Sequence, residues 1–211
     1  IPICRWYKRV LRVMKRKHQV AEVQSESPLS KKMTVFAIGI LLVLIFSKYI
    51  YMASLSSYYT FYLIHKFGVS VQSSQIFLFV FLFATAAGTL IGGPLGDRIG
   101  RKYVIWISIL GTAPFSLLMP HVGLVWTCIL SFIIGLILSS AFPAILLYAQ
   151  ELLPYKLGLV SGLFFGFAFG IAGIASAVLG NMADTYGIEA VYNVCGYMPL
   201  LGLVTYFLSL I

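Results

Sequence analysis

Long apolar segments recur along this chain and constrain its fold more than any other feature. Six of them, 17 to 32 residues long, can cross the roughly 30 Å hydrocarbon core of a bilayer. They cover residues 33–64, 75–95, 103–119, 123–148, 157–180 and 190–211. Only 10% of the 211 residues are charged, against about 25% in soluble domains. We therefore predict an all-α membrane protein with six transmembrane helices and the lipid bilayer as its solvent.

The basic residues are distributed unevenly between the two sides of the membrane that six crossings define. Nine of the fifteen Lys and Arg precede residue 33, and the loops 96–102 and 149–156 add three and one on the same side. The opposite side has only Lys66. Because cytoplasmic loops are rich in Lys and Arg, both ends of this segment are predicted to be cytoplasmic.

The first 32 residues form a basic region ahead of the six-helix bundle, which we place at 33–211. We interpret residues 1–32 as a cytoplasmic linker joined to the end of a preceding helix, with a helix resting on anionic headgroups as the alternative. Basic residues beside apolar spans are typical of the membrane surface rather than of nucleic-acid binding. Residue 1 is Ile rather than Met, so we expect a piece of a longer protein.

Charge is concentrated again in the loop that follows the second predicted span, which reads GPLGDRIGRK over residues 93–102. This stretch resembles the signature of the major facilitator superfamily, a glycine, an acid-base pair, and then Gly-Arg-Lys. The wider text is similar to the fosmidomycin resistance proteins, a bacterial drug-efflux family within that superfamily. The similar stretches are FSKYIYMASLSSYYTFYL (46–63), GGPLGDRIGRKYVIW (92–106), YAQELLP (148–154) and SGLFFGFAFG (161–170).

The resemblance implies the C-terminal half of a twelve-helix secondary transporter that works by alternating access. It further implies export of a small anionic antibiotic of the fosmidomycin (phosphonate) type, in exchange for protons, across the bacterial inner membrane. The N-terminal six-helix half would be its partner. Uptake of a small metabolite anion by the same fold, and a non-transporting membrane adaptor, remain as alternatives.

The glycines and the acid of this motif have a physical reading of their own. Gly93, Gly96 and Gly100 allow a sharp turn and close approach of neighbouring helices, since glycine tolerates φ > 0 and has no side chain. Asp97 can accept hydrogen bonds from an exposed helix N-terminus, whose N–H groups carry partial positive charge. The family architecture places that helix in the other half, so Asp97 is expected to act as a cytoplasmic gate.

The bases of the motif divide into two roles. Arg101 is expected to pair with Glu151, because both lie at the cytoplasmic face and a guanidinium matches a carboxylate. Arg98 and Lys102 are expected to anchor the loop at the cytoplasmic surface.

Lys48 is the one base deep inside a predicted span. An ammonium at that depth is costly, so it should face a cavity or a partner. Tyr51, Ser56 and Tyr59 follow it at helical spacing, and a cation flanked by hydroxyls suits a small anion. We therefore predict that these four residues bind the substrate.

Two further spans carry small residues. Ser139, Ser140 and Tyr148 can line a cavity near Pro143, although serines in spans more often serve helix packing. In the fifth span glycine recurs every fourth residue, which predicts a smooth surface for helix packing. These residues are Gly158, Gly162, Gly166 and Gly170.

Sequence signatures of catalysis are missing. The chain contains no HExxH, no phosphate-binding loop and no GxSxG, and its three histidines and three cysteines are scattered. We therefore expect neither an enzyme nor a metal or cofactor site.

Overall fold

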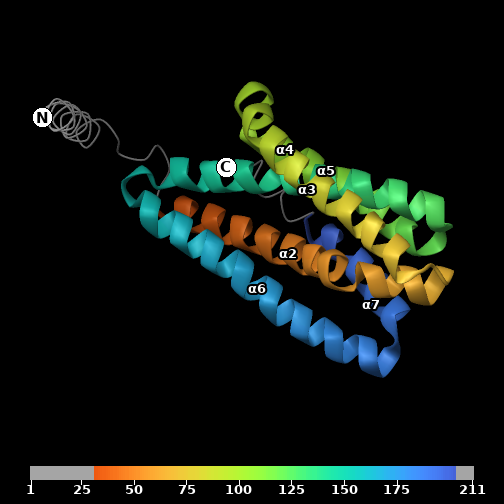
Figure 1. The fold of residues 1–211 in the computed structure, drawn as a ribbon. Coiled ribbons are helices and arrows are strands. Elements are labelled where there is room, and N and C mark those ends of the chain that lie inside the picture. Colours follow the sequence, from red (N-terminus) through yellow and green to blue (C-terminus); the bar gives the residue numbers. More distant parts are fainter. Residues whose placement is uncertain (1–30, 203–211) are drawn as a thin grey trace, which may run out of the picture.

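The computed structural model describes residues 31–202, so the predicted linker at 1–32 lies almost wholly outside the described residues. Within the described range every regular element is helical (Figure 1). The α-helices are α2 Lys31–Phe67, α3 Val71–Ile99, α4 Arg101–Leu118, α5 Leu124–Leu152, α6 Leu157–Tyr186 and α7 Ile188–Gly196, and two short 3-10 helices are η1 Met119–His121 and η2 Pro154–Lys156.

Five of these helical stretches, containing α2 to α6, are long and apolar enough to cross a membrane. The prediction of an all-α membrane protein is thereby confirmed. The sixth predicted span, 190–211, is described only as far as residue 202. Its beginning is the nine-residue helix α7, followed by 3-10 geometry over residues 198–202.

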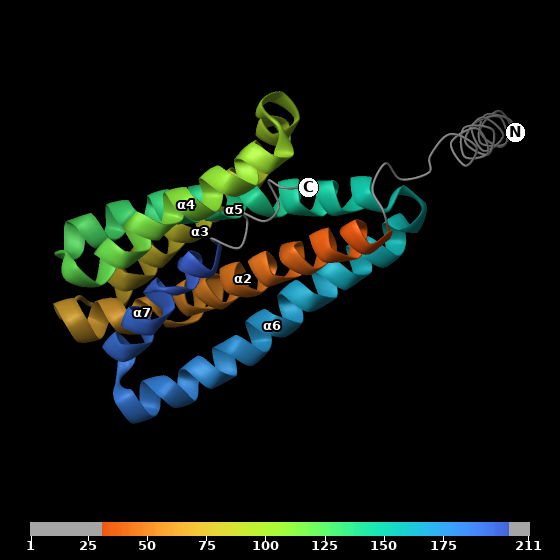
Figure 2. The same cartoon turned by 180° about the vertical axis from the view of Figure 1, so that it is seen from behind.

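The helices associate in two groups that share α2. α5 packs against α3 and α4, whereas α2 packs against α6 and also contacts α3, α5 and α7. Both ribbon views show α2 and α6 running side by side (Figures 1 and 2). α2 therefore connects the two groups along most of its 37 residues.

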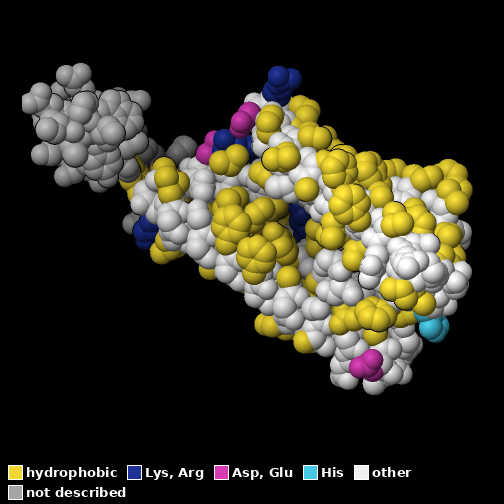
Figure 3. All heavy atoms as spheres, viewed as in Figure 1, with side chains coloured by type: hydrophobic (Ala, Val, Ile, Leu, Met, Phe, Trp, Pro, Cys, Tyr) yellow, Lys and Arg dark blue, Asp and Glu magenta, His cyan; other side chains and the backbone are white. Residues whose placement is uncertain are grey.

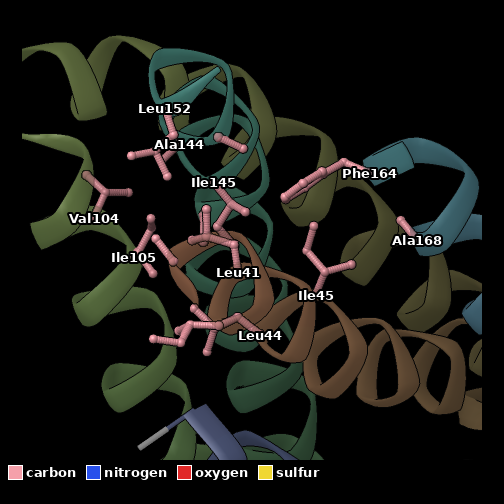
Figure 4. Close-up of a cluster of buried hydrophobic side chains, with 14 of the residues drawn as sticks. Leu41, Leu44, Ile45, Val104, Ile105, Ala144, Ile145, Leu152, Phe164 and Ala168 are labelled. Atoms are coloured by element: carbon pink, nitrogen blue, oxygen red, sulfur yellow. The ribbon is translucent and has the colours of Figure 1, made fainter. Parts of the chain in front are cut away.

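Buried apolar side chains form two clusters at different depths. The first, which we call the Leu41 cluster, joins the beginning of α2 to α4, to the end of α5 and to the beginning of α6 (Figure 4). The second, which we call the Tyr59 cluster, joins the later part of α2 to α3, α5 and α7. On α2 the Leu41 cluster ends at Ile45 and the Tyr59 cluster begins at Tyr51.

Glycine allows α3 to lie very close to α5. A Cβ placed on Gly88 would collide with the backbone of Leu136, and one on Gly92 would collide with the backbone of Ser140. This approach through small residues is the typical packing of membrane helices, since it brings backbones into van der Waals contact. It fixes the distance between the faces of α3 and α5 at this depth.

Candidate functional site

Lys48 lies on α2 between the two apolar clusters. Its side chain is 4% exposed, and its Nζ has no hydrogen-bond partner among the described residues. A base inside a span without a partner is costly and marks a functional position in most membrane proteins. The ammonium is therefore available to a group from outside residues 31–202.

A cavity of about 210 Å³ opens beside Lys48. Three helices line it, and its polar and aromatic lining consists of Lys48, Tyr49, Thr85, Thr89, Ser139 and Phe142. Figure 3 shows a hollow on this face of the molecule with a basic side chain visible inside it. The volume lies below the 300 to 1,000 Å³ that is usual for ligand pockets, which suits a small ligand or one side of a shared site.

The structure does not bring Lys48 together with the two predicted tyrosines, because Tyr51 and Tyr59 lie in the Tyr59 cluster and do not line the cavity. The Tyr51 hydroxyl faces the Met119 sulfur at 3.9 Å, and the Tyr59 hydroxyl donates to Ser131 Oγ at 2.9 Å. Tyr59 shares the angular direction of Lys48, but it lies about 16 Å farther along the helix axis. At that depth the Tyr59 ring lies against α3, with its centre 6.2 Å from that of the Phe81 ring.

Ser56 is also outside the cavity lining. Its side chain is exposed and lies 3.4 Å from the carbonyl oxygen of Ala53 in the same helix. Of the four predicted substrate-binding residues, the structure thus places only Lys48 at the cavity.

α3 contributes two cavity-lining residues that were not predicted from the sequence. Thr85 and Thr89 stand four residues apart on one face of that helix and both line the cavity. The signal that could have found them is the row Gly88, Gly92 and Gly96, which marks the face of α3 in close contact with α5. Ser139, weighed as a lining residue but assigned to packing, does line the cavity, and its hydroxyl has no partner in the described chain.

Pro143 has a specific effect beside Ser139. Within α5, Pro143 has no N–H to donate to the carbonyl oxygen four residues earlier, which belongs to Ser139. Ser139 is 5% exposed. The carbonyl of Ser139 therefore lacks its usual helical donor. Its hydroxyl also has no partner among the described residues.

At one end of the bundle, Arg101 joins three helices. Its Nη1 lies 2.6 Å from Glu151 Oε1 at the end of α5, and its Nη2 lies 3.4 Å from Asp97 Oδ1 at the end of α3. The predicted pairing of Arg101 with Glu151 is present in the structure. Asp97 is 62% exposed at its side chain, so most of its surface remains accessible.

The motif is a helix end rather than the predicted loop 96–102. α3 continues to Ile99, so Gly93 and Gly96 are helical and do not turn the chain. Gly100 alone makes the turn, with φ of 102°, in a region that favours glycine. Gly96 lies against Arg101 and Ala144, whereas a Cβ on Gly93 would meet no atom within 4 Å.

The two remaining bases of the motif differ in their surroundings. Arg98 is exposed. The Nζ of Lys102 lies 5.7 Å from the centre of the Tyr148 ring, within the range of a cation–π contact.

The glycine row of α6 faces away from the described helices. Gly158, Gly162, Gly166 and Gly170 are exposed, and an added Cβ on any of them would meet no atom within 4 Å. If this row packs against a helix, that helix lies outside residues 31–202.

No group of three or more His, Cys, Asp and Glu that could hold a metal ion occurs in the part of the chain that the structure describes. Its four acids, Asp97, Glu151, Asp184 and Glu189, lie at or near helix ends. The chemistry of the cavity is therefore that of a cation, hydroxyl groups and aromatic rings.

Comparison with known proteins gives similar transporters. The chain is 60% identical over 206 residues to the fosmidomycin resistance protein of Escherichia coli (strain K12), which covers 98% of this chain and 50% of that protein. It is 39% identical over 155 residues to the uncharacterized MFS-type transporter YfnC of Bacillus subtilis (strain 168), covering 74% of this chain and 38% of that protein. The chain spans half or less of the length of these relatives. No solved structure matches.

The family assignment follows from a match over most of the chain. The family model described as the Major Facilitator Superfamily matches residues 33–210, which include all five candidate spans except the first residue of the first. This family consists of membrane transporters rather than enzymes. The chain belongs to the Major Facilitator Superfamily.

Proposed function

We propose that this chain is the second half of a secondary transporter that exports a small anionic drug of the phosphonate type in exchange for protons. The observation that carries the proposal is Lys48, a buried base with no partner among residues 31–202, beside a cavity in the middle of the bundle. A protein cation in a low-dielectric site attracts an anion far more strongly than in water. The similarity to a fosmidomycin resistance protein supports the choice of drug.

The proposed arrangement in the membrane follows the charges. The end of the bundle that is rich in bases is assigned to the cytoplasm, and the end with Lys66 is assigned to the outside. The bases at the cytoplasmic end are Lys32, Arg98, Arg101, Lys102 and Lys156. The membrane is the bacterial inner membrane, in keeping with the bacterial relatives. The other six-helix half is the partner across which the site alternates.

The cytoplasmic motif is proposed to gate this movement. Asp97 is accessible, and a helix N-terminus of the other half can donate hydrogen bonds to it when the cytoplasmic side is closed. Arg101 and Glu151 hold the ends of α4 and α5 together beside it. Protons are proposed to be carried by an acid of the other half, since the four described acids lie at or near helix ends.

The test is drug export by the complete transporter, this chain together with the other half, in cells and in inside-out vesicles. Lys48→Ala is expected to abolish export of fosmidomycin at a normal protein level, and Lys48→Arg to retain part of it. Lys66→Ala, at the outer end of the same helix, serves as the control for loss of a base. Full export by Lys48→Ala would remove the proposal.

A further inference from the structure

We infer that the cavity selects small anions that also carry a hydrogen-bond donor at their far end, and that Thr85 and Thr89 recognise this donor. The inference rests on the proposed function, since it names the substrate class of the same site. It is carried by the direction of the hydrogen bonds on the two sides of the cavity.

The side formed by α2 and α5 offers hydrogen-bond donors. The ammonium of Lys48 and the hydroxyl of Ser139 are both buried, at 4% and 5% exposure, and neither has a partner among the described residues. An ammonium has three N–H donors and no acceptor, and a free hydroxyl can donate one hydrogen bond. This side fits the oxygens of a phosphonate, a phosphate or a carboxylate.

The side formed by α3 offers acceptors. Thr85 Oγ1 donates its proton to the carbonyl of Leu82 at 2.7 Å, and Thr89 Oγ1 donates to the carbonyl of Thr85 at 2.9 Å. While its one proton is engaged with a backbone carbonyl, each hydroxyl offers a ligand its lone pairs rather than a donor. A second anionic group would therefore meet lone pairs here, whereas an O–H or N–H group would be bound.

The cavity also has an aromatic wall on its α2 and α5 side. Tyr49 and Phe142 line it with their ring centres 5.6 Å apart in an edge-to-face arrangement. A short carbon chain between the anionic group and the donor suits these walls. The ligand class is thus a small oxyanion with a hydroxyl, N-hydroxy or ammonium group at the other end of a short aliphatic chain.

The experiment compares two probes in inside-out vesicles that contain the complete transporter. Fosmidomycin bears a phosphonate and an N-hydroxy group, and its N-methoxy analogue keeps the charge but lacks the O–H donor. The apparent KM for fosmidomycin is expected to be about fivefold to tenfold lower than that for the analogue, the usual effect of one hydrogen bond.

The double variant Thr85→Val/Thr89→Val, which keeps the shape of both side chains, is expected to bring this ratio close to one. The double variant Thr85→Ser/Thr89→Ser keeps both acceptors and should preserve the ratio. Thr185→Val is the matched control, because Thr185, at the exposed end of α6, donates to the carbonyl four residues earlier as Thr89 does.

The two levels of the proposal fail in different ways. An unchanged probe ratio in Thr85→Val/Thr89→Val, with export still dependent on Lys48, would overturn the donor inference and leave the proposed function standing. Export that does not depend on Lys48 would overturn the proposed function itself.

Discussion

The guanidinium of Arg101 lies 2.6 Å from the carboxylate of Glu151, which ties the beginning of α4 to the end of α5. The same guanidinium lies 3.4 Å from Asp97 at the end of α3. Three helix ends therefore meet around one side chain, at the end of the bundle that we assign to the cytoplasm.

Exchange of the two charges tests the Arg101–Glu151 pair. Arg101→Glu and Glu151→Arg are each expected to reduce transport strongly, because like charges then face each other. Arg101→Glu/Glu151→Arg should recover a large part of it. The effect on thermal stability should be small, since exposed ion pairs contribute roughly 0.2 to 1 kcal/mol. Arg98→Gln is the control for loss of a base in the same motif, and failure of the double variant to recover transport would argue against the pair.

Asp97→Asn tests the proposed gate. The substitution removes the charge and keeps the shape, so a bond to a helix N-terminus of the other half is weakened without a change in packing. We expect reduced drug export at an unchanged level of protein in the membrane. We also expect a cysteine introduced at the cavity to react faster with a reagent added from the cytoplasmic side, because that side is closed less often. Normal export and accessibility in Asp97→Asn would leave this aspartate with a purely local role.

Substitution of the α3 glycines tests the close approach to α5. Gly88→Ala and Gly92→Ala place a Cβ against the backbone of Leu136 or Ser140, and forced backbone shifts of this kind cost about 1 to 3 kcal/mol. Both variants should melt at lower temperature in detergent and lose substrate affinity, because α3 carries Thr85 and Thr89. Gly162→Ala, which meets no atom within 4 Å, is the matched control for stability.

The glycine row of α6 gives a separate prediction. Gly162→Leu and Gly166→Leu are expected to leave the packing within this half unchanged, since neither site touches the described helices. If the row packs against the other half, transport by the complete protein should fall while its melting temperature changes little. Transport at the normal rate in both variants would show that the row faces lipid.

Tyr59→Phe separates the Tyr59 cluster from the cavity. The variant loses the hydrogen bond to Ser131 and is expected to be less stable by about 1 kcal/mol. Its apparent KM for fosmidomycin should remain that of the unmodified protein, since Tyr59 does not line the cavity. A clearly higher KM would restore this tyrosine to the substrate site.

The sequence predicted well which segments cross the membrane and at which membrane face the charged residues lie. Segment length located α2 to α6, and the rarity of charge in the spans drew attention to Lys48, the base that the structure leaves without a partner among the described residues. The pairing of Arg101 with Glu151 could be predicted as well, because both residues lie at the same membrane face.

The rotation of each helix about its axis could not be predicted in this way. A helix that is apolar on all sides has no hydrophobic face that tells which residues turn inward. Thr85 and Thr89 were therefore missed. Tyr59 was grouped with Lys48 for a different reason, because the two share one angular direction although Tyr59 lies about 16 Å farther along the axis, where its hydroxyl bonds to Ser131 of α5. The helical state of Gly93 and Gly96, beside Pro94, was also not predicted. Glycine and proline usually end helices in soluble proteins, but both are common within membrane helices.

The single-residue connection at Gly100 has a mechanical consequence. Two successive Cα atoms are about 3.8 Å apart, so the ends of α3 and α4 can separate only by changing the torsion angles of one or two residues. With Arg101 paired to Glu151, a displacement of α3 is expected to move α4 and α5 together. We therefore expect the three helix ends to move together, so that a displacement at Asp97 shifts α3 and with it the threonines that line the cavity.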